Sequence, residues 1–206
     1  MTLLIVRHAQ THSNVARHFQ GSGTGAGSTL TEEGQRQARA LANHLVKHFE
    51  VDKIYSSPSQ RTLETANILN KSLQIPLTIQ SELREIDCGD WENKASDLIE
   101  RSYPEQWALW QNEPLAFCFP NGESLLNVQA RTTLLLKNLT NETKGTVLLV
   151  SHSATISVML AFLHGWSLEK AWAEGRAYHQ NTAFSKLEFD AGNLILSEIA
   201  CTPHLQ

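Results

Sequence analysis

The stretch Leu3-Leu4-Ile5-Val6-Arg7-His8 is a short apolar run that ends in a charged pair, and Val147-Leu148-Leu149-Val150-Ser151-His152 follows the same design later in the chain. Unbroken apolar runs of this length are typical of strands that are buried on both faces of a largely parallel sheet. In such a sheet both histidines would lie at the carboxyl edge, where open α/β folds bind their ligands. The two runs therefore predict the fold class and the location of a site together.

Two amphipathic helices are predicted between these runs. The first follows Thr31, which can cap it, and its apolar stripe consists of Ala38, Leu41, Ala42, Leu45, Val46 and Phe49. The second begins in Ser57-Pro58-Ser59-Gln60, where the first serine can cap, proline suits the first helical position and glutamine can complete a capping box. Arg61 is therefore expected in the first turn of this helix.

Short strands are predicted at 52–55 and 77–79, and a third long helix with a wide apolar stripe is predicted after Gly122. The stripe includes Leu125, Leu126, Val128, Ala130, Leu134, Leu135 and Leu139. Residues 183–189 and 194–199, joined through 190–193, predict a closing antiparallel hairpin. The expected fold is a three-layer α/β/α sandwich with a mostly parallel sheet and a C-terminal antiparallel hairpin.

Two segments are irregular. Residues 21–28 have the glycine-rich composition of a loop, and residues 82–121 hold three tryptophans and several prolines. We expect the second segment to form a small cap over the carboxyl edge of the sheet. The whole chain, 1–206, is expected to be a single domain with this cap as an insertion.

Composition narrows the functional classes. A formal net charge of −4, with no long run of either sign, gives no indication of a nucleic-acid or anionic-membrane surface. Three widely spaced cysteines without paired spacing argue against a disulfide framework or a zinc ribbon. Because the opening apolar run is too short for a secretory signal, a cytoplasmic protein without a membrane segment is expected.

The residues at the strand ends suit phosphoryl transfer, which requires a nucleophile, an acid and positive donors around the phosphate oxygens. Arg7 and Arg61 offer planar donor forks, and the helix that begins near Ser57 adds the positive end of its dipole. His152 provides a third donor. His8, at the end of a rigid strand, can act as a nucleophile when one ring nitrogen donates to a fixed acceptor and the other is neutral.

Five short motifs occur in order along the chain: Arg7-His8-Ala9-Gln10-Thr11 with Asn14, Ser57-Pro58 with Arg61-Thr62 and Thr65-Ala66, Leu83-Arg84-Glu85 with Gly89-Asp90-Trp91-Glu92, Gly122-Glu123-Ser124, and Ser151-His152. Together they resemble the phosphoglycerate mutase-like branch of the histidine phosphatase superfamily. Each motif is weak alone, but the ordered set runs from Leu3 to about Ser153 and is specific as a whole.

The resemblance implies a metal-independent phosphomonoesterase, without a cofactor, in which His8 becomes phosphorylated. Arg7, Arg61 and His152 would hold the phosphate. Glu85 would protonate the leaving group and then deprotonate the attacking water. Since His8 must be neutral to attack and Glu85 must be protonated to donate, a bell-shaped or acid-leaning pH profile is expected.

Other positions follow from the same resemblance. Asn14 would contact phosphate or substrate, Gln20 and Gly21 would face the substrate, and Ser153 could narrow the phosphate pocket or lend it a hydroxyl donor. The family usually has glycine where this chain has Ala9, and two glycines where it has Ser153-Ala154. The glycine-rich loop replaces the aspartate and proline common there, which leaves the substrate open: a sugar phosphate, phosphoglycerate, ribazole phosphate or a broad range.

Several alternatives stay open at this point. A phosphoglycerate mutase would use the same His8 but return the phosphoryl group to substrate, and a non-catalytic regulatory module would only bind phosphate. A metallohydrolase would use His8, His12 and His152 as ligands. Three further carboxylates lie within reach of the acid's position in sequence: Glu82, Asp87 and Asp90. The partner is expected to be a small phosphate ester, and the sequence is compatible with a homodimer.

Overall fold

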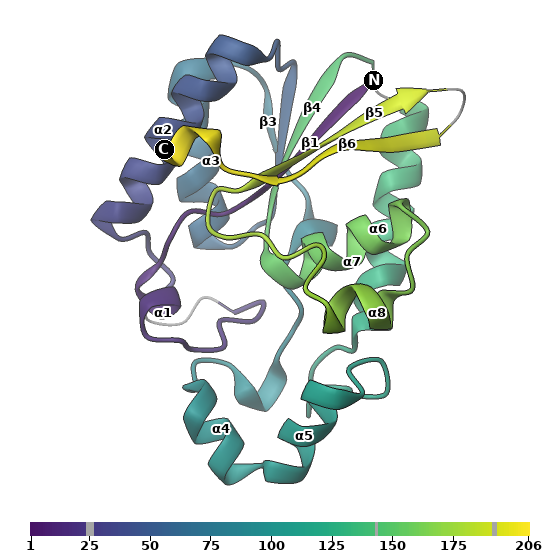
Figure 1. The fold of residues 1–206 in the computed structure, drawn as a ribbon. Helices are drawn as coiled ribbons and strands as arrows, with labels where there is room; N and C mark the ends of the chain where they lie inside the picture. Colours follow the sequence, from purple (N-terminus) through teal and green to yellow (C-terminus); the bar gives the residue numbers. More distant parts are fainter. Residues whose placement is uncertain (24–26, 143, 191–192) are drawn as a thin grey trace.

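The computed structural model describes residues 1–23, 27–142, 144–190 and 193–206 and contains one six-stranded sheet in the order β3-β2-β4-β1-β5-β6 (Figure 1). The strands are β1 (Thr2–Arg7), β2 (Lys53–Ser56), β3 (Leu77–Ile79), β4 (Thr146–Ser151), β5 (Phe184–Asp190) and β6 (Asn193–Cys201). The first four pair in parallel with one another, whereas β5 is antiparallel to β1 and to β6. The predicted parallel core and C-terminal hairpin are confirmed.

Helices cover both faces of the sheet. On one face, α2 (Glu32–His48) and α3 (Gln60–Leu73) pack against Leu4 and Val6 of β1. On the other face, α6 (Leu125–Glu142) and α7 (Ser153–Leu163) pack against Leu3 and Ile5. Because the side chains of β1 alternate between two helical layers, a continuous apolar run is required, and the three-layer sandwich is confirmed.

A small cap lies beyond the carboxyl edge of the sheet, at the bottom of Figure 1. It comprises η1 (Ser81–Leu83), η2 (Gly89–Trp91), α4 (Ser96–Ser102) and α5 (Pro104–Asn112). An aromatic cluster holds it together, with the Trp91 ring 5.3 Å from that of Phe119 and 5.4 Å from that of Phe19. Phe19 follows α1 (His12–Val15), so the cap is packed against the loop after β1. The remaining elements are α8 (Leu168–Ala173) and η3 (Pro203–Leu205).

The predicted start of α3 is wrong in detail. The helix begins at Gln60 with Ser59 in the extended N-cap position, and no side chain caps it. Ser57 and Pro58 precede the helix because the backbone N–H of Ser57 still pairs with Val150 of β4. The expected place of Arg61 in the first turn is confirmed.

The apolar stripes of two helices are narrower than the sequence indicates. Val46 of α2 is 53% exposed, and Leu126 and Leu134 of α6 are 52% and 59% exposed. Each helix packs against the sheet along one side, so apolar residues at the margin of the stripe face solvent.

The prediction for the loop 21–28 falls partly on residues 24–26 and that for the turn 190–193 partly on 191–192, which lie outside the described residues. Among the described helices, none combines the length and apolarity needed to cross a bilayer.

Replacing Gly34 with alanine is expected to lower the free energy of unfolding by about 1–3 kcal/mol. A Cβ atom at this buried position of α2 would lie 2.1 Å from the carbonyl oxygen of Gln10, in the loop that follows β1. In an unhindered helix the same change raises the free energy of unfolding by about 0.5–1 kcal/mol. A decrease measured by urea unfolding would therefore show that the close contact is present. The exposed neighbour Gln35→Ala is the matched control and should change stability by less than about 0.5 kcal/mol. A stabilised Gly34→Ala protein would contradict the contact.

Candidate active site

The parallel register of β1 and β4 brings the two strand-end histidines together. Arg7 pairs with Ser151, and the next backbone N–H, that of His8, donates to the Ser151 carbonyl oxygen at 2.9 Å. The imidazole rings of His8 and His152 have centroids 5.3 Å apart, and both side chains are buried. The sheet edge therefore forms the centre of the candidate site.

His8 is held in one tautomer. Its Nδ1 lies 2.8 Å from the carbonyl oxygen of Ala9, which can only accept, so Nδ1 carries the proton and Nε2 keeps a free lone pair. The strand end is fixed as well, because Thr65 accepts from the Ala9 N–H and the Asn181 side chain donates to the His8 carbonyl oxygen. Burial, together with the charges of Arg61 and Arg7, holds the pKa of His8 well below its ordinary value. A neutral, oriented imidazole is the form that can attack.

Arg7 and Arg61 present unsatisfied donors. Arg61 donates through Nη2 to the Gly21 carbonyl oxygen at 2.6 Å, and Arg7 donates through Nη1 to the His179 carbonyl oxygen at 2.6 Å. Arg7 Nε and Arg61 Nη1 are buried and have no hydrogen-bond partner among the described residues. Burial lowers the pKa of Arg61 to about 10, which leaves the guanidinium charged at neutral pH. Buried cationic donors without a partner are costly, and an anion would satisfy them.

His152 lies behind Arg61 rather than on the cavity wall. Its Nδ1 accepts from Arg61 Nε at 3.2 Å, so the ring proton is on Nε2, which lies 2.7 Å from Ser57 Oγ. Ser57, which we expected to cap α3, instead orients this imidazole. Burial, followed by the charge of Arg61, keeps the pKa of His152 well below its ordinary value.

Glu85 is fixed at the N-terminus of α7. Its Oε1 accepts from the backbone N–H and the hydroxyl of Thr155, both at 3.0 Å, and from the N–H of Ile86 at 3.0 Å, whereas Oε2 accepts only from the Ala154 N–H at 3.2 Å. No side chain of α7 caps the helix, so the carboxylate satisfies its first donors. The less engaged oxygen, Oε2, is the one available to exchange a proton.

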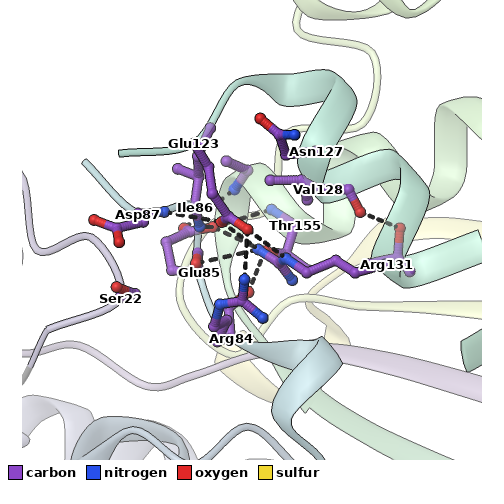
Figure 2. A network of polar contacts seen from close by, with 12 residues as sticks. Ser22, Arg84, Glu85, Ile86, Asp87, Glu123, Asn127, Val128, Arg131 and Thr155 are labelled. Atoms are coloured by element: carbon purple, nitrogen blue, oxygen red, sulfur yellow. Dashed lines mark hydrogen bonds and ion pairs between the residues drawn. The ribbon is translucent and has the colours of Figure 1, made fainter. Parts of the chain in front are cut away.

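A second layer of ion pairs supports the backbone of Glu85 (Figure 2). Arg131 of α6 donates to the carbonyl oxygens of Glu82 and Glu85 and pairs with Glu123 at 3.1 Å. Glu123 also pairs with Arg84 at 2.5 Å, and it accepts from the Asp87 N–H. The segment that carries the acid is thereby tied to the start of α6.

The three other carboxylates that the sequence left as candidates for the acid accept hydrogen bonds from other groups. Glu82 accepts from Gln80 and Ser81, Asp87 accepts from the Gly89 N–H, and Asp90 accepts from Asn121. Among the described residues, Glu85 is the only carboxylate that lines the cavity at this sheet edge.

This cavity has a volume of about 320 Å³. The predicted site residues that line it are Arg7, His8, Asn14, Gln20, Gly21, Arg61, Glu85 and Ser153. His152 is the predicted residue that does not line it, because its ring is turned toward Arg61 and Ser57. Asn14 Oδ1 accepts from the side chain of Asn181, which precedes β5, and Gln20 accepts from the Thr11 hydroxyl, so hydrogen bonds hold both lining side chains in place.

Three contributors were missed by sequence reasoning. Asn181 donates to the carbonyl oxygen of His8, the carbonyl oxygen of His179 accepts from Arg7, and the Ser57 hydroxyl accepts from Nε2 of His152. Asn181 and His179 lie in the connection before β5, where no periodicity marks them, and Ser57 carried the misleading signal of a helix cap. Only the assembled sheet edge reveals these contacts.

The histidines of the metallohydrolase alternative are not assembled. His12 begins α1 and is exposed, whereas His8 and His152 are buried beside each other. Within the described ranges, no group of three or more histidine, cysteine, aspartate or glutamate side chains is arranged to hold a metal ion. Cys88 also lines the cavity, and burial raises the pKa of its thiol well above the ordinary value, which disfavours a reactive thiolate.

Comparison with known proteins agrees with this geometry. A family model described as the histidine phosphatase superfamily (branch 1) matches residues 3–202. Phosphoserine phosphatase 1 of Hydrogenobacter thermophilus is 30% identical over 204 residues, which cover 98% of this chain and 93% of that protein. The adenosylcobalamin/α-ribazole phosphatase of Salmonella typhimurium is 29% identical over 173 residues, 84% of this chain and 84% of that protein. The structure of Bacillus stearothermophilus YhfR superposes with a TM-score of 0.90 at 30% identity and covers 100% of this chain and 99% of that one.

Buried neutral histidines should make the fold sensitive to acid. Burial lowers the pKa of His179 from 6.5 to about 4, so between these values the unfolded chain binds a proton that the folded chain does not. The stability that this group contributes is complete above pH 6.5 and falls as the pH drops toward 4. The expected slope is about 1.4 kcal/mol per pH unit for one histidine. Urea unfolding should be measured for His179→Gln across this pH range. The slope of its unfolding free energy against pH should be smaller than that of the unaltered protein by the contribution of one proton. An unchanged slope would mean that His179 is not held neutral.

Proposed function

The chain belongs to branch 1 of the histidine phosphatase superfamily, and from that membership we propose that it hydrolyses phosphate monoesters through a covalent phosphohistidine at His8. It is a phosphatase of the histidine phosphatase type, and the proposal concerns its mechanism. One observation carries it: the two arginines that each keep a buried nitrogen without a partner among the described residues line the same cavity as His8, whose Nε2 keeps its lone pair. An anionic group that satisfies both arginines is thereby presented to the nucleophile.

In the first step, Nε2 of neutral His8 attacks phosphorus, and the bond between phosphorus and the alcohol oxygen breaks. Glu85, protonated at Oε2, gives its proton to the leaving oxygen, so an alcohol departs and a phosphorus–nitrogen bond remains. In the second step, water attacks phosphorus while the Glu85 carboxylate takes a proton from it. The phosphorus–nitrogen bond breaks, and inorganic phosphate and neutral His8 are regenerated.

The cationic groups stabilise the charge that builds on the equatorial oxygens. Arg7 and Arg61 would donate from Nε and Nη1, the atoms that lack partners in the described residues. His152, whose Nδ1 accepts from Arg61, fixes the orientation of that guanidinium. Preorganised donors in a water-poor site make the largest contribution to such reactions.

Loss of the nucleophile should abolish turnover. With p-nitrophenyl phosphate, His8→Ala should lower kcat by at least about 10⁴-fold, because no covalent path is left. Phosphate release by the unaltered protein should persist in excess chelator, and acid-quenched mass spectrometry should place the phosphoryl group on the peptide that contains His8. Exposed His12→Ala is the matched control.

The outcomes of this experiment separate the alternatives. A phosphohistidine that forms on His8 but passes its phosphoryl group to phosphoglycerate faster than to water would indicate mutase chemistry. Phosphate binding without any phosphohistidine would indicate a non-catalytic module. Loss of turnover in chelator, restored by a divalent metal, would contradict the mechanism.

Replacing the acid should affect substrates according to their leaving groups. Glu85→Gln keeps the shape of the side chain but cannot exchange the proton, so hydrolysis of an alkyl phosphate should fall by about 10²–10⁴-fold. The formation of phosphohistidine from p-nitrophenyl phosphate, whose leaving group needs no proton, should fall far less in a stopped-flow burst. Glu82→Gln is the control for a neighbouring carboxylate that does not line the cavity. Equal loss of burst rate with both classes of ester would remove Glu85 from the role of acid.

A further inference from the structure

Aromatic side chains from four separate segments line the same cavity as the two arginines. They are Phe19 after α1, Trp110 of α5, Phe119 at the end of the cap, Trp172 of α8, and Tyr178 after α8. Four of the rings form a chain of contacts: the Trp110 centroid lies 5.2 Å from that of Trp172 and 5.0 Å from that of Phe119, which in turn is 6.2 Å from Phe19. Together with Tyr178 they give the cavity an aromatic wall.

Few charged side chains line this cavity, and the proposed mechanism already uses them. Within the part of the chain that the structure describes, its charged side chains are Arg7, Arg61 and Glu85, and its imidazoles are His8 and His18. Both arginines are assigned to the phosphate by the proposed function. None of residues 24–26, 140–143 and 190–194, whose side chains are not described, is lysine, arginine or histidine. A substrate carboxylate would find Glu85 nearby and, apart from His18, no second cation.

The Tyr178 ring marks where the phosphate end meets the aromatic wall. The guanidinium carbon of Arg7 lies 5.8 Å from the centre of this ring, so the phenol borders the phosphate-binding cation. Tyr178 is nonetheless 61% exposed, and Trp172 is only partly buried. Both side chains therefore lie at the open side of the cavity, where they have apolar surface left for a ligand.

We propose that the alcohol part of the substrate is apolar, an aromatic or alkyl group about the size of one ring, which packs against Trp172 and Tyr178. This inference rests on the proposed function and specifies its substrate class. A cavity of about 320 Å³ has room for a phosphate with one such group. Burial of each additional methylene in a wall of this kind is worth about 4-fold in kcat/KM. A compact zwitterion such as phosphoserine would leave the wall unfilled and its carboxylate unpaired.

The test compares alkyl phosphates that share a primary alcohol as leaving group. We expect kcat/KM for 2-phenylethyl phosphate to exceed that for ethyl phosphate and for phosphoserine by at least about 10-fold, since only the first fills the wall. Phosphoserine turned over as well as or better than 2-phenylethyl phosphate would overturn the inference. In that case hydrolysis and phosphohistidine formation would still uphold the proposed function. Failure to release phosphate from any of the three esters and from p-nitrophenyl phosphate would overturn both.

Variants at the open side of the cavity assign the preference to the wall. Trp172→Ala should raise KM for 2-phenylethyl phosphate by about 10-fold, with little change for ethyl phosphate, and Trp172→Phe should restore most of the loss. Inhibition by inorganic phosphate, which does not reach the wall, should be unchanged. The matched control His18→Gln should leave the ratio between phosphoserine and 2-phenylethyl phosphate unchanged. A selective loss of phosphoserine hydrolysis in His18→Gln would show that His18 binds a carboxylate and would contradict the inference.

Discussion

Parallel pairing of β1 with β4 is the constraint on which the rest of the site depends. It places Arg7 beside Ser151, and the chain then leaves both strands at the same edge, with His8 bonded to the carbonyl of Ser151. The register cannot slip by one residue, because Leu3 and Ile5 would exchange helical layers with Leu4 and Val6. The separation of the two imidazoles is therefore set by backbone hydrogen bonds in a buried sheet, which are among the stiffest contacts in the molecule.

Burial at this edge concentrates positive charge without a matching carboxylate in direct contact. Arg61 donates to a carbonyl oxygen and to a neutral imidazole, and Arg7 donates to a carbonyl oxygen, so neither guanidinium is neutralised by an ion pair. The same cations help to keep His8 neutral. In the proposed mechanism, desolvation makes the unpaired donors attractive to phosphate and keeps His8 unprotonated, so one physical condition would serve both binding and attack.

Glu85, the proposed acid, is positioned by a different arrangement. Glu85 comes from an irregular segment, yet its carboxylate accepts the first backbone donors of α7, the helix that directly follows His152. Arg131 and Glu123 fix the backbone of that segment from α6 (Figure 2). The proposed nucleophile and the proposed acid are thus both held at the carboxyl end of β4. The aromatic cap completes the enclosure by packing Phe19 against Trp91, which joins the loop after β1 to the cap.

The sequence by itself determined the parallel core, the edge at which His8 and His152 lie, and Arg61 in the first turn of α3, because hydrophobic periodicity and strand-end position are local properties. It misassigned Ser57, whose capping signal is local while its partner, the His152 ring, lies 95 residues away. Tertiary structure alone decided which carboxylate lines the cavity and that His152 turns toward Arg61. It alone revealed the support from Asn181 and the gathering of five aromatic side chains from four segments into one wall. Contacts between distant side chains depend on how whole elements pack, and no local pattern encodes them.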